Sequence, residues 1–396
     1  MSALPLHDYH PTTTKLLLII LVTLTAAFTT APKAYSATIP LGSVTQVSQP
    51  PYPCGSTFYP GMLCFDATVV CPSTDNINVT FGYTGPTQLT TPLGTIVFFS
   101  GGTGTTPAAP GEDLTAYSDE YVKKYRIVQI AWESAWEKAT ASGAQSILLA
   151  ACRPATLLKW INDSAAVHPA GAMCAQGKSA GSGAIAYAMS WYGAGGYLKN
   201  VELLAGPVFS KIDDGCNPTP PTVSMCPSGG ICTPGTTSWS RSAGYTSDKA
   251  TAINAWSGLA KCTQSSVNSG DLQTWAGMSI VNGSYSGVSP VFTFSGTKRH
   301  GWICAGNNTN YDNWAADCPN NNAFCPNNSS PQGYDWYAAA TDGNLKVSGT
   351  NQCDGTTNST TSTEAEGVDG TNAKDPDATS TPEKTAIQND MTSNCL

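Results

Sequence analysis

The sequence of 396 residues has little charge and few histidines. Asp, Glu, Lys and Arg make up 12% of it, against about 25% in a typical soluble domain. The 19 basic residues are outnumbered by 27 acidic ones, so the formal net charge is −8. Because phosphate contacts need clustered Lys and Arg, this balance argues against nucleic acid as a partner. The four histidines leave little choice for a general base and little room for a metal site built on imidazole.

No stable membrane span is expected once the N-terminus has been processed. Residues 16–28 form an apolar run that follows Lys15; it is short for a bilayer span but has the length of a signal-peptide core. Ala34 and Ser36 are small, as a signal peptidase requires. We therefore predict a signal peptide over residues 1–36, cleaved before Ala37, and a secreted, extracellular mature protein. The alternative is an N-terminal membrane anchor.

The 14 cysteines form an even set, which in an exported chain indicates disulfide bonds. There is no Cys-x-x-Cys pair, and only His168 and His300 follow the predicted cleavage site, so no zinc site is expected. Spacing alone does not give the pairing. Three groups lie close in sequence: Cys54, Cys64 and Cys71; Cys216, Cys226 and Cys232; Cys304, Cys318 and Cys325. N-glycosylation sequons also indicate a glycoprotein, at Asn78, Asn162, Asn282, Asn307, Asn327, Asn328 and Asn358.

Apolar runs and helical patterns alternate through the middle of the chain. Continuous apolar runs predict strands at residues 95–100, 126–132, 172–176 and 201–205. Apolar residues at helical spacing predict helices at residues 113–125, 154–161 and 180–192. This alternation is typical of an α/β fold with a mostly parallel, doubly wound sheet covered on both faces.

The flanking segments differ in composition from this core of residues 95–354. Residues 37–94 predict a β-rich N-terminal segment, and the loop-rich, Cys-rich residues 216–288 predict a cap inserted over the sheet. Further strands are expected at residues 290–295 and 345–347. Residues 355–396 contain almost no apolar side chain and predict a disordered, low-complexity tail, apart from whatever holds Cys395.

One motif carries chemistry. Residues 177–181 read G-x-S-x-G around Ser179, between a buried strand and an Ala-rich helix, which is the setting of a nucleophile elbow. The turn strains the serine, its glycines remove clashes, and the helix N-terminus favours negative charge that develops nearby. The same letters end a Walker A loop, but that motif needs glycine where this chain has Ala172, so we reject a nucleotide-binding interpretation.

With this elbow, this order of elements and the loop Gly101-Gly102-Thr103-Gly104, the chain resembles the α/β-hydrolase superfamily over about residues 95–350. The resemblance implies Ser179 as nucleophile. It also implies an oxyanion hole made by the backbone N–H of Ala180 with that of Gly102 or Thr103. Lipase-type motifs begin this loop with His, whereas this chain has Ser100. No cofactor or metal is implied.

The histidine of the triad departs from the family pattern. The family order is Ser, acid, His, and His300 is the only histidine downstream of Ser179. It follows the strand expected at residues 290–295, where the family has its acid, while residues 349–354 contain no histidine. Three interpretations stay open: the strand count is wrong by one; the roles are exchanged, with Asp354 or Glu366 as acid; or the histidine has been lost.

For the acid, Asp213 and Asp214 follow the strand at residues 201–205, a second position that some hydrolases use. The leading hypothesis is a secreted serine hydrolase that acts on small-molecule or polymeric carboxylic esters through an acyl-enzyme. One alternative is a catalytically inactive α/β-hydrolase-fold protein that binds a ligand or a surface. The other is an extracellular serine peptidase with the same residues.

Overall fold

The structure is a computed structural model, and its described residues begin at Thr38. The predicted signal peptide therefore stays a prediction. The structure describes residues 38–45, 47–72, 74–85, 89–107, 121–138, 146–204, 206–213, 222–223, 239–240, 269–304, 336, 339–340, 345–350 and 382–396.

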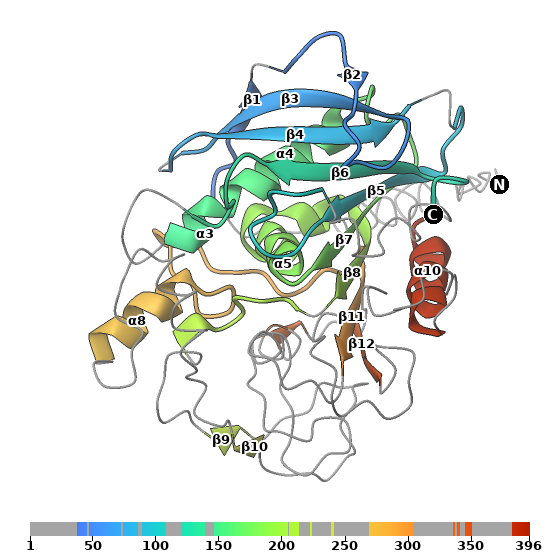
Figure 1. Cartoon of the computed structure of the whole chain (residues 1–396). Helices are drawn as coiled ribbons and strands as arrows, with labels where there is room; N and C mark the ends of the chain where they lie inside the picture. The colour runs from blue at the N-terminus through green and yellow to red at the C-terminus, as the bar shows by residue number, and fades with distance from the viewer. Residues whose placement is uncertain are drawn as a thin grey trace, which may run out of the picture. The chain divides into compact units, whose positions relative to one another are not determined.

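One ten-stranded mixed sheet runs through the described part of the chain (Figure 1). Its order is β1 (Ser43–Thr45), β3 (Met62–Val70), β4 (Ile77–Thr84), β6 (Arg126–Trp132), β5 (Gly94–Phe99), β7 (Ala172–Lys178), β8 (Leu198–Leu204), β11 (Lys298–Cys304) and β12 (Leu345–Thr350), with β2 (Tyr52–Pro53) paired to β3. Strands β1 to β4 and the β4–β6 pair are antiparallel, whereas β6, β5, β7, β8, β11 and β12 are parallel neighbours. An antiparallel start, then a parallel run in which β6 and β5 exchange places, is the strand order of α/β hydrolases, so the predicted fold class is confirmed.

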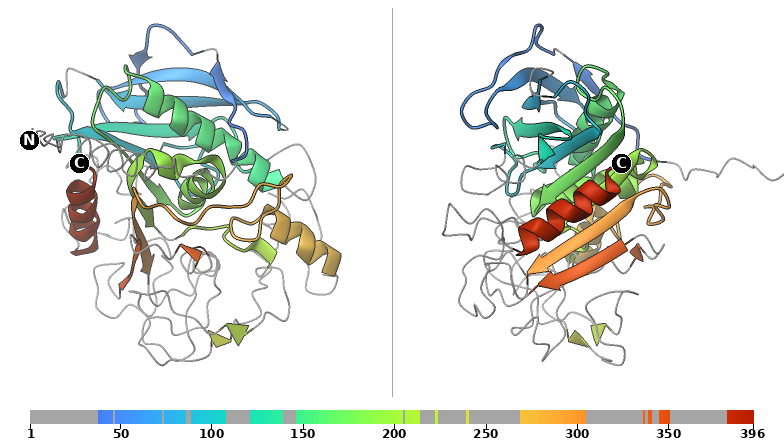
Figure 2. Two further views of the ribbon diagram at one scale, coloured as in Figure 1. Left: turned by 180° about the vertical axis from the view of Figure 1, so that it is seen from behind. Right: turned by 90° about the vertical axis from the view of Figure 1, so that its right-hand side faces the viewer.

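Both faces of the parallel strands β5 and β7 are buried. The described helices are α3 (Ser146–Ala150), α4 (Cys152–Asp163), α5 (Ala180–Tyr192), the 3-10 turn η1 (Ala194–Gly196), α8 (Ser269–Met278) and α10 (Pro382–Asn394). Helices α4 and α5 pack in one core cluster with Val97 and Ala175, while their sequence neighbours Ile96 and Cys174 pack with α10 in another. Figure 2 shows α10 lying along β8 and β11. Since neighbouring strand residues face opposite ways, α5 and α10 cover opposite faces.

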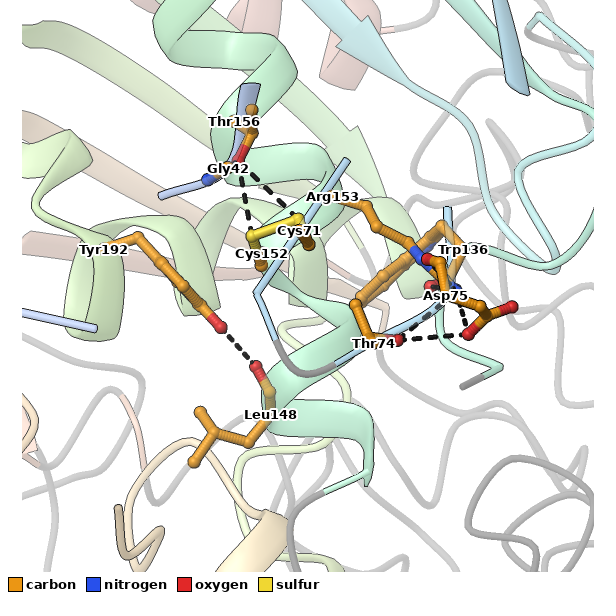
Figure 3. Close-up of a disulfide and its surroundings, with 10 residues drawn as sticks. All are labelled: Gly42, Cys71, Thr74, Asp75, Trp136, Leu148, Cys152, Arg153, Thr156 and Tyr192. Carbon is orange, nitrogen blue, oxygen red and sulfur yellow. Dashed lines mark hydrogen bonds and ion pairs between the residues drawn. A yellow bond between two sulfur atoms is a disulfide. The ribbon is translucent and has the colours of Figure 1, made fainter. Parts of the chain in front are cut away.

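Disulfides hold the ends of this fold together, and three join cysteines in the described segments: Cys54–Cys64, Cys71–Cys152 and Cys174–Cys395. Around Cys71–Cys152, the buried Arg153 donates from Nη2 to Asp75 Oδ1 (2.7 Å) and from Nη1 to the carbonyl of Trp136 (2.9 Å) (Figure 3). This contact region fastens the N-terminus of α4 to the segment after β3 and to the loop after β6.

Several predicted elements are confirmed. Strands β5, β6, β7, β8 and β12 include most or all of the predicted runs, and α5 has the predicted bounds. Helix α5 ends because Gly193 adopts a left-handed conformation with φ 78°. The helix predicted at residues 113–125 lies largely outside the described residues. Of the predicted cap, the structure describes β9 (Thr222–Val223), β10 (Trp239–Ser240), α8 and residues 279–288, so the cap stays a prediction.

The strand prediction at residues 290–295 is wrong. Val291 donates its N–H to the Ser190 carbonyl in α5 (2.8 Å), and the ring of Phe294 stacks on Trp336 with centroids 6.1 Å apart. This apolar run therefore packs beneath α5 instead of joining the sheet, and β11 begins only at Lys298.

The prediction of a disordered tail, apart from whatever holds Cys395, is wrong for residues 382–394, which form α10. Ile387, Met391 and Cys395 recur every four residues and are fully buried against the sheet. Within the described segments, none of the helices is both long and apolar enough to cross a membrane.

Candidate functional site

Ser179 lies between β7 and α5 in a strained conformation. Its φ of 49° and ψ of −117° are rare for a residue other than glycine. The Ser179 N–H donates to the Leu204 carbonyl (2.9 Å), and Ser182 Oγ donates to the Ser179 carbonyl (2.5 Å). The backbone on both sides thus holds the serine in the sharp turn that a nucleophile elbow requires.

Two glycines make this turn possible. A Cβ on Gly177 would lie 2.5 Å from the Gly181 carbonyl oxygen, and a Cβ on Gly181 would overlap the carbonyl oxygen of Phe99. Backbone atoms cannot move aside as a flexible side chain can. The G-x-S-x-G pattern therefore reflects close packing of α5 against the ends of β5 and β7.

The glycine-rich loop at residues 101–104 lies beside the serine. A Cβ on Gly101 would be 3.4 Å from Ser179 Cβ, and Gly102 has a φ of +58°. Within the described part of the chain, the N–H groups of Gly102 and Thr103 form no hydrogen bond with the backbone. These two amides, and that of Ala180 at the start of α5, are thus candidate donors for an oxyanion.

The loop after β6 supports the glycine-rich loop from behind. The N–H of Trp132 donates to the Gly104 carbonyl (2.9 Å), and that of Trp136 donates to the Thr103 carbonyl (3.4 Å). The Trp136 ring makes an edge contact with Phe209, with centroids 6.2 Å apart. Both tryptophans are buried in the core, so they fix the position of the loop.

The structure does not bring His300 to Ser179. His300 lies inside β11, in register with Glu202 of β8, which is in register with Gln176 of β7. His300 thus lies two strands away from β7 and three residues before the level of Ser179. With standard strand spacings, the Cα atoms of His300 and Ser179 are roughly 14 Å apart. Its Nδ1 lies 3.4 Å from Asp390 Oδ2 of α10, on the face opposite α5. The predicted role of His300 as the base for Ser179 is therefore wrong, because β11 begins later than expected.

His168, the other histidine in the described segments, is also far from the elbow. Its Nδ1 lies 2.9 Å from Thr95 Oγ1 near the beginning of β5, whereas Ser179 follows the carboxyl end of β7. Burial, and to a lesser extent the charge of Arg126, lowers the pKa of His168. Neither histidine of the described residues can serve Ser179.

Among the predicted acids, the structure describes only Asp213. It ends the segment 206–213, which follows β8. In this segment the Val208 carbonyl oxygen packs closely on the first turn of α5, because a Cβ on Gly183 would lie only 2.8 Å from it. Asp213 is half-buried, and its neighbour Ile212 donates its N–H to Ser279 Oγ (2.8 Å). This segment thus packs near the elbow. Asp214, Asp354 and Glu366 lie outside the described residues, so the choice of acid stays a prediction.

Glu137, in the loop after β6, is a titratable residue that the sequence did not reveal. Its side chain is fully buried, and its two carboxylate oxygens have no hydrogen-bond partner among the described residues. Burial raises the pKa of Glu137 to about 8, despite the opposing effects of its own N–H and of Arg153. The carboxyl is therefore mostly protonated at neutral pH. A lone glutamate in a loop carries no sequence signal for this state.

A groove of about 640 Å³ crosses β3, β4 and β6, and Ser179 does not line it. Asp66 in this groove accepts hydrogen bonds from Tyr52 Oη (2.9 Å) and Thr80 Oγ1 (2.6 Å). Its lining is polar around a few apolar positions: Asp66, Ala67, Thr68, Asn78, Val79, Thr80, Thr105, Ala131, Trp132 and Glu133.

The comparisons with known proteins find similar structures but no similar sequence. No protein-family model matches the chain, and no curated protein matches it in sequence. Carboxyl esterase 2 from the fungus Tuber melanosporum aligns at 12% identity over 95% of this chain and 99% of its own, with a TM-score of 0.44. Acetyl xylan esterase 1 from a Thermoanaerobacterium species aligns at 9% identity over 78% and 80%, with a TM-score of 0.42. An esterase from Pyrococcus furiosus aligns at 10% identity over 84% and 91%, with a TM-score of 0.41. These values are too low to assign an activity, so the site must be judged on its own geometry.

Proposed function

We propose that the protein is a secreted carboxylic ester hydrolase in which Ser179 is the nucleophile. The observation that carries this proposal is the strained backbone of Ser179, held between β7 and α5 with the loop at residues 101–104 beside it. A serine in this conformation costs of order 1–3 kcal/mol, and such strain is concentrated at functional sites. The disulfides support an oxidising compartment.

The chemistry follows from the elbow. Ser179 Oγ attacks the ester carbonyl carbon while its proton passes to water, and the carbonyl oxygen becomes an oxyanion that accepts hydrogen bonds from the N–H of Ala180 and of Gly102 or Thr103. The C–O bond to the leaving group then breaks, the departing alkoxide takes a proton from water, and a second water hydrolyses the acyl-enzyme. Ester substrates fit this site better than peptides, because a leaving amine needs a proton that a triad histidine normally supplies. This reasoning disfavours the peptidase alternative.

The decisive measurement is a covalent adduct. An oxyanion hole and substrate binding leave about 10³–10⁴-fold catalysis even without a triad member. The steady-state rate alone therefore cannot distinguish a serine nucleophile from a site that activates water. We expect p-nitrophenyl acetate to add one acetyl group to the wild-type protein, detected by intact mass and mapped to Ser179. The exposed-serine control Ser56→Ala should acquire the same adduct.

Ser179→Ala should show neither the adduct nor a burst of p-nitrophenol. An acetyl group retained in Ser179→Ala, or none in wild type at any time, would remove Ser179 from the mechanism. The second outcome supports the other candidate function, a hydrolase-fold protein that binds a ligand without turnover. The position of His300, against α10 and away from the elbow, favours that candidate.

A further inference from the structure

A row of polar side chains crosses the sheet beneath α10. Gln176, Glu202 and His300 are in register on the adjacent parallel strands β7, β8 and β11, so their side chains point to the same face. All three side chains are buried. Asp390 of α10 completes the cluster from above, with its Oδ2 lying 3.4 Å from His300 Nδ1.

The donor atoms converge on one point. One ligand atom each from Glu202, His300 and Asp390 lies within 4.8 Å of the other two. Ligands bound at 2.0–2.1 Å to a tetrahedral ion are separated by about 3.4 Å, and the His300–Asp390 distance already matches this value. Two carboxylates and one imidazole make a donor set with charge to balance a divalent cation. The imidazole nitrogen favours a transition metal over Ca²⁺ or Mg²⁺.

The surroundings supply an independent indication of a bound group. Asn200 Nδ2 donates to Glu202 Oε1 (2.7 Å), which orients the carboxylate as an outer-shell partner does. However, Asn200 Oδ1 and both amide atoms of Gln176 are buried and have no hydrogen-bond partner among the described residues. A buried polar group without a partner is destabilising, so these atoms point to a bound group. Gln176 is in register with Glu202 and Asn200 hydrogen-bonds to it, so both amides adjoin the carboxylate that would hold an ion.

We propose that Glu202, His300 and Asp390 bind a divalent transition-metal ion, with Zn²⁺ the best match, and that water occupies its fourth position. One ligand comes from each of β8, β11 and α10, so the ion fastens the C-terminal helix to the sheet (Figure 2). The Cys174–Cys395 disulfide fixes the end of the same helix. The three proposed ligands are widely separated in sequence and include only one histidine, so no metal-binding sequence motif predicts them.

The test is a Zn²⁺ titration of the full chain after chelation and dialysis, followed by calorimetry and by metal analysis of the washed protein. We expect one Zn²⁺ per chain and a higher melting temperature with Zn²⁺. Asp390→Asn and His300→Gln should each weaken Zn²⁺ binding by at least about 100-fold, whereas Gln176→Leu should weaken it by about 10–100-fold. Asp163→Asn, an exposed carboxylate paired with Lys159 in α4, is the matched control and should bind as wild type.

Circular dichroism of each metal-free variant establishes that it is folded before titration. The proposal fails if wild type binds no Zn²⁺, in which case the row is a hydrated polar network. It also fails if Zn²⁺ binds equally well to folded Asp390→Asn and His300→Gln. Ser179→Ala should bind Zn²⁺ unchanged, so this result and the fate of the proposed esterase activity are independent.

Discussion

Replacing Glu137 by Gln should change how the stability of the protein depends on pH. The pKa of this buried carboxyl is raised from 4.5 to about 8, so it is neutral in the folded protein while the unfolded chain ionises it above pH 4.5. The unfolded state then binds fewer protons, and the free energy of unfolding falls as pH rises from about 4.5 to 8. Because the pKa of Glu137 differs by this much between the unfolded and folded states, the free energy of unfolding should fall by about 3–4 kcal/mol between pH 5 and pH 8.

Urea unfolding of the wild type and Glu137→Gln at pH 5, 6, 7 and 8 measures this effect. The amide is neutral at every pH and nearly the same shape, so the variant should lack this part of the pH dependence. The difference in unfolding free energy between the two proteins should shift by about 3–4 kcal/mol across the range, in favour of the variant at pH 8. Glu133→Gln, an exposed glutamate in the same loop, is the control and should run parallel to wild type. If the wild-type and Glu137→Gln profiles are parallel, Glu137 does not carry the buried proton.

Two further predictions concern the elbow and the C-terminal helix. Gly181→Ala should destabilise the protein by at least about 1–3 kcal/mol and abolish labelling of Ser179, because the new Cβ overlaps the Phe99 carbonyl; thermal unfolding and a fluorophosphonate probe measure the two effects. An unchanged melting temperature with full labelling would contradict the packing argument. Cys395→Ser should cost about 2–5 kcal/mol by removing a disulfide to Cys174 that spans 221 residues. Urea unfolding checks it, and a loss below about 1 kcal/mol would show that α10 packs without its disulfide.

Elements with a consistent local pattern could be predicted from the sequence. Strands β5 and β7 are buried throughout because both of their faces are covered, and the apolar runs within them stand out from their surroundings. Helix α5 is rich in small residues, begins directly after Ser179 and ends before Gly193, so both of its bounds are marked in the sequence. The elbow needed glycines at two positions where a side chain would strike backbone. In each case one local requirement determined both the residue type and the structure.

Long-range contacts could not be predicted in the same way. Residues 290–295 are apolar enough for a strand, but Phe294 finds a partner in Trp336, which is distant in sequence. Among the described positions of α10, Ile387 and Met391 are buried apolar residues, and Cys395 follows the helix; the charged and polar residues between them make the segment look like a polar tail. The burial of Glu137 depends on packing around Arg153 and the loop after β6, and no local pattern encodes that packing.

The position of His300 follows from the alternation of side chains along β11, where successive residues point to opposite faces of the sheet. Because β11 begins at Lys298, His300 is its third residue and lies on the same face of the sheet as Glu202. A histidine could act as the base for Ser179 only from a loop beyond the carboxyl ends of the strands. The remaining histidines are His168, which lies near the beginning of β5, and two in the predicted signal peptide. Acyl transfer at Ser179 would then proceed without an imidazole from the described residues, which is why the acyl adduct matters more than the rate. The same alternation points His300 toward Glu202 and Asp390. The histidine that cannot act in a triad with Ser179 is therefore the one that completes the proposed metal site.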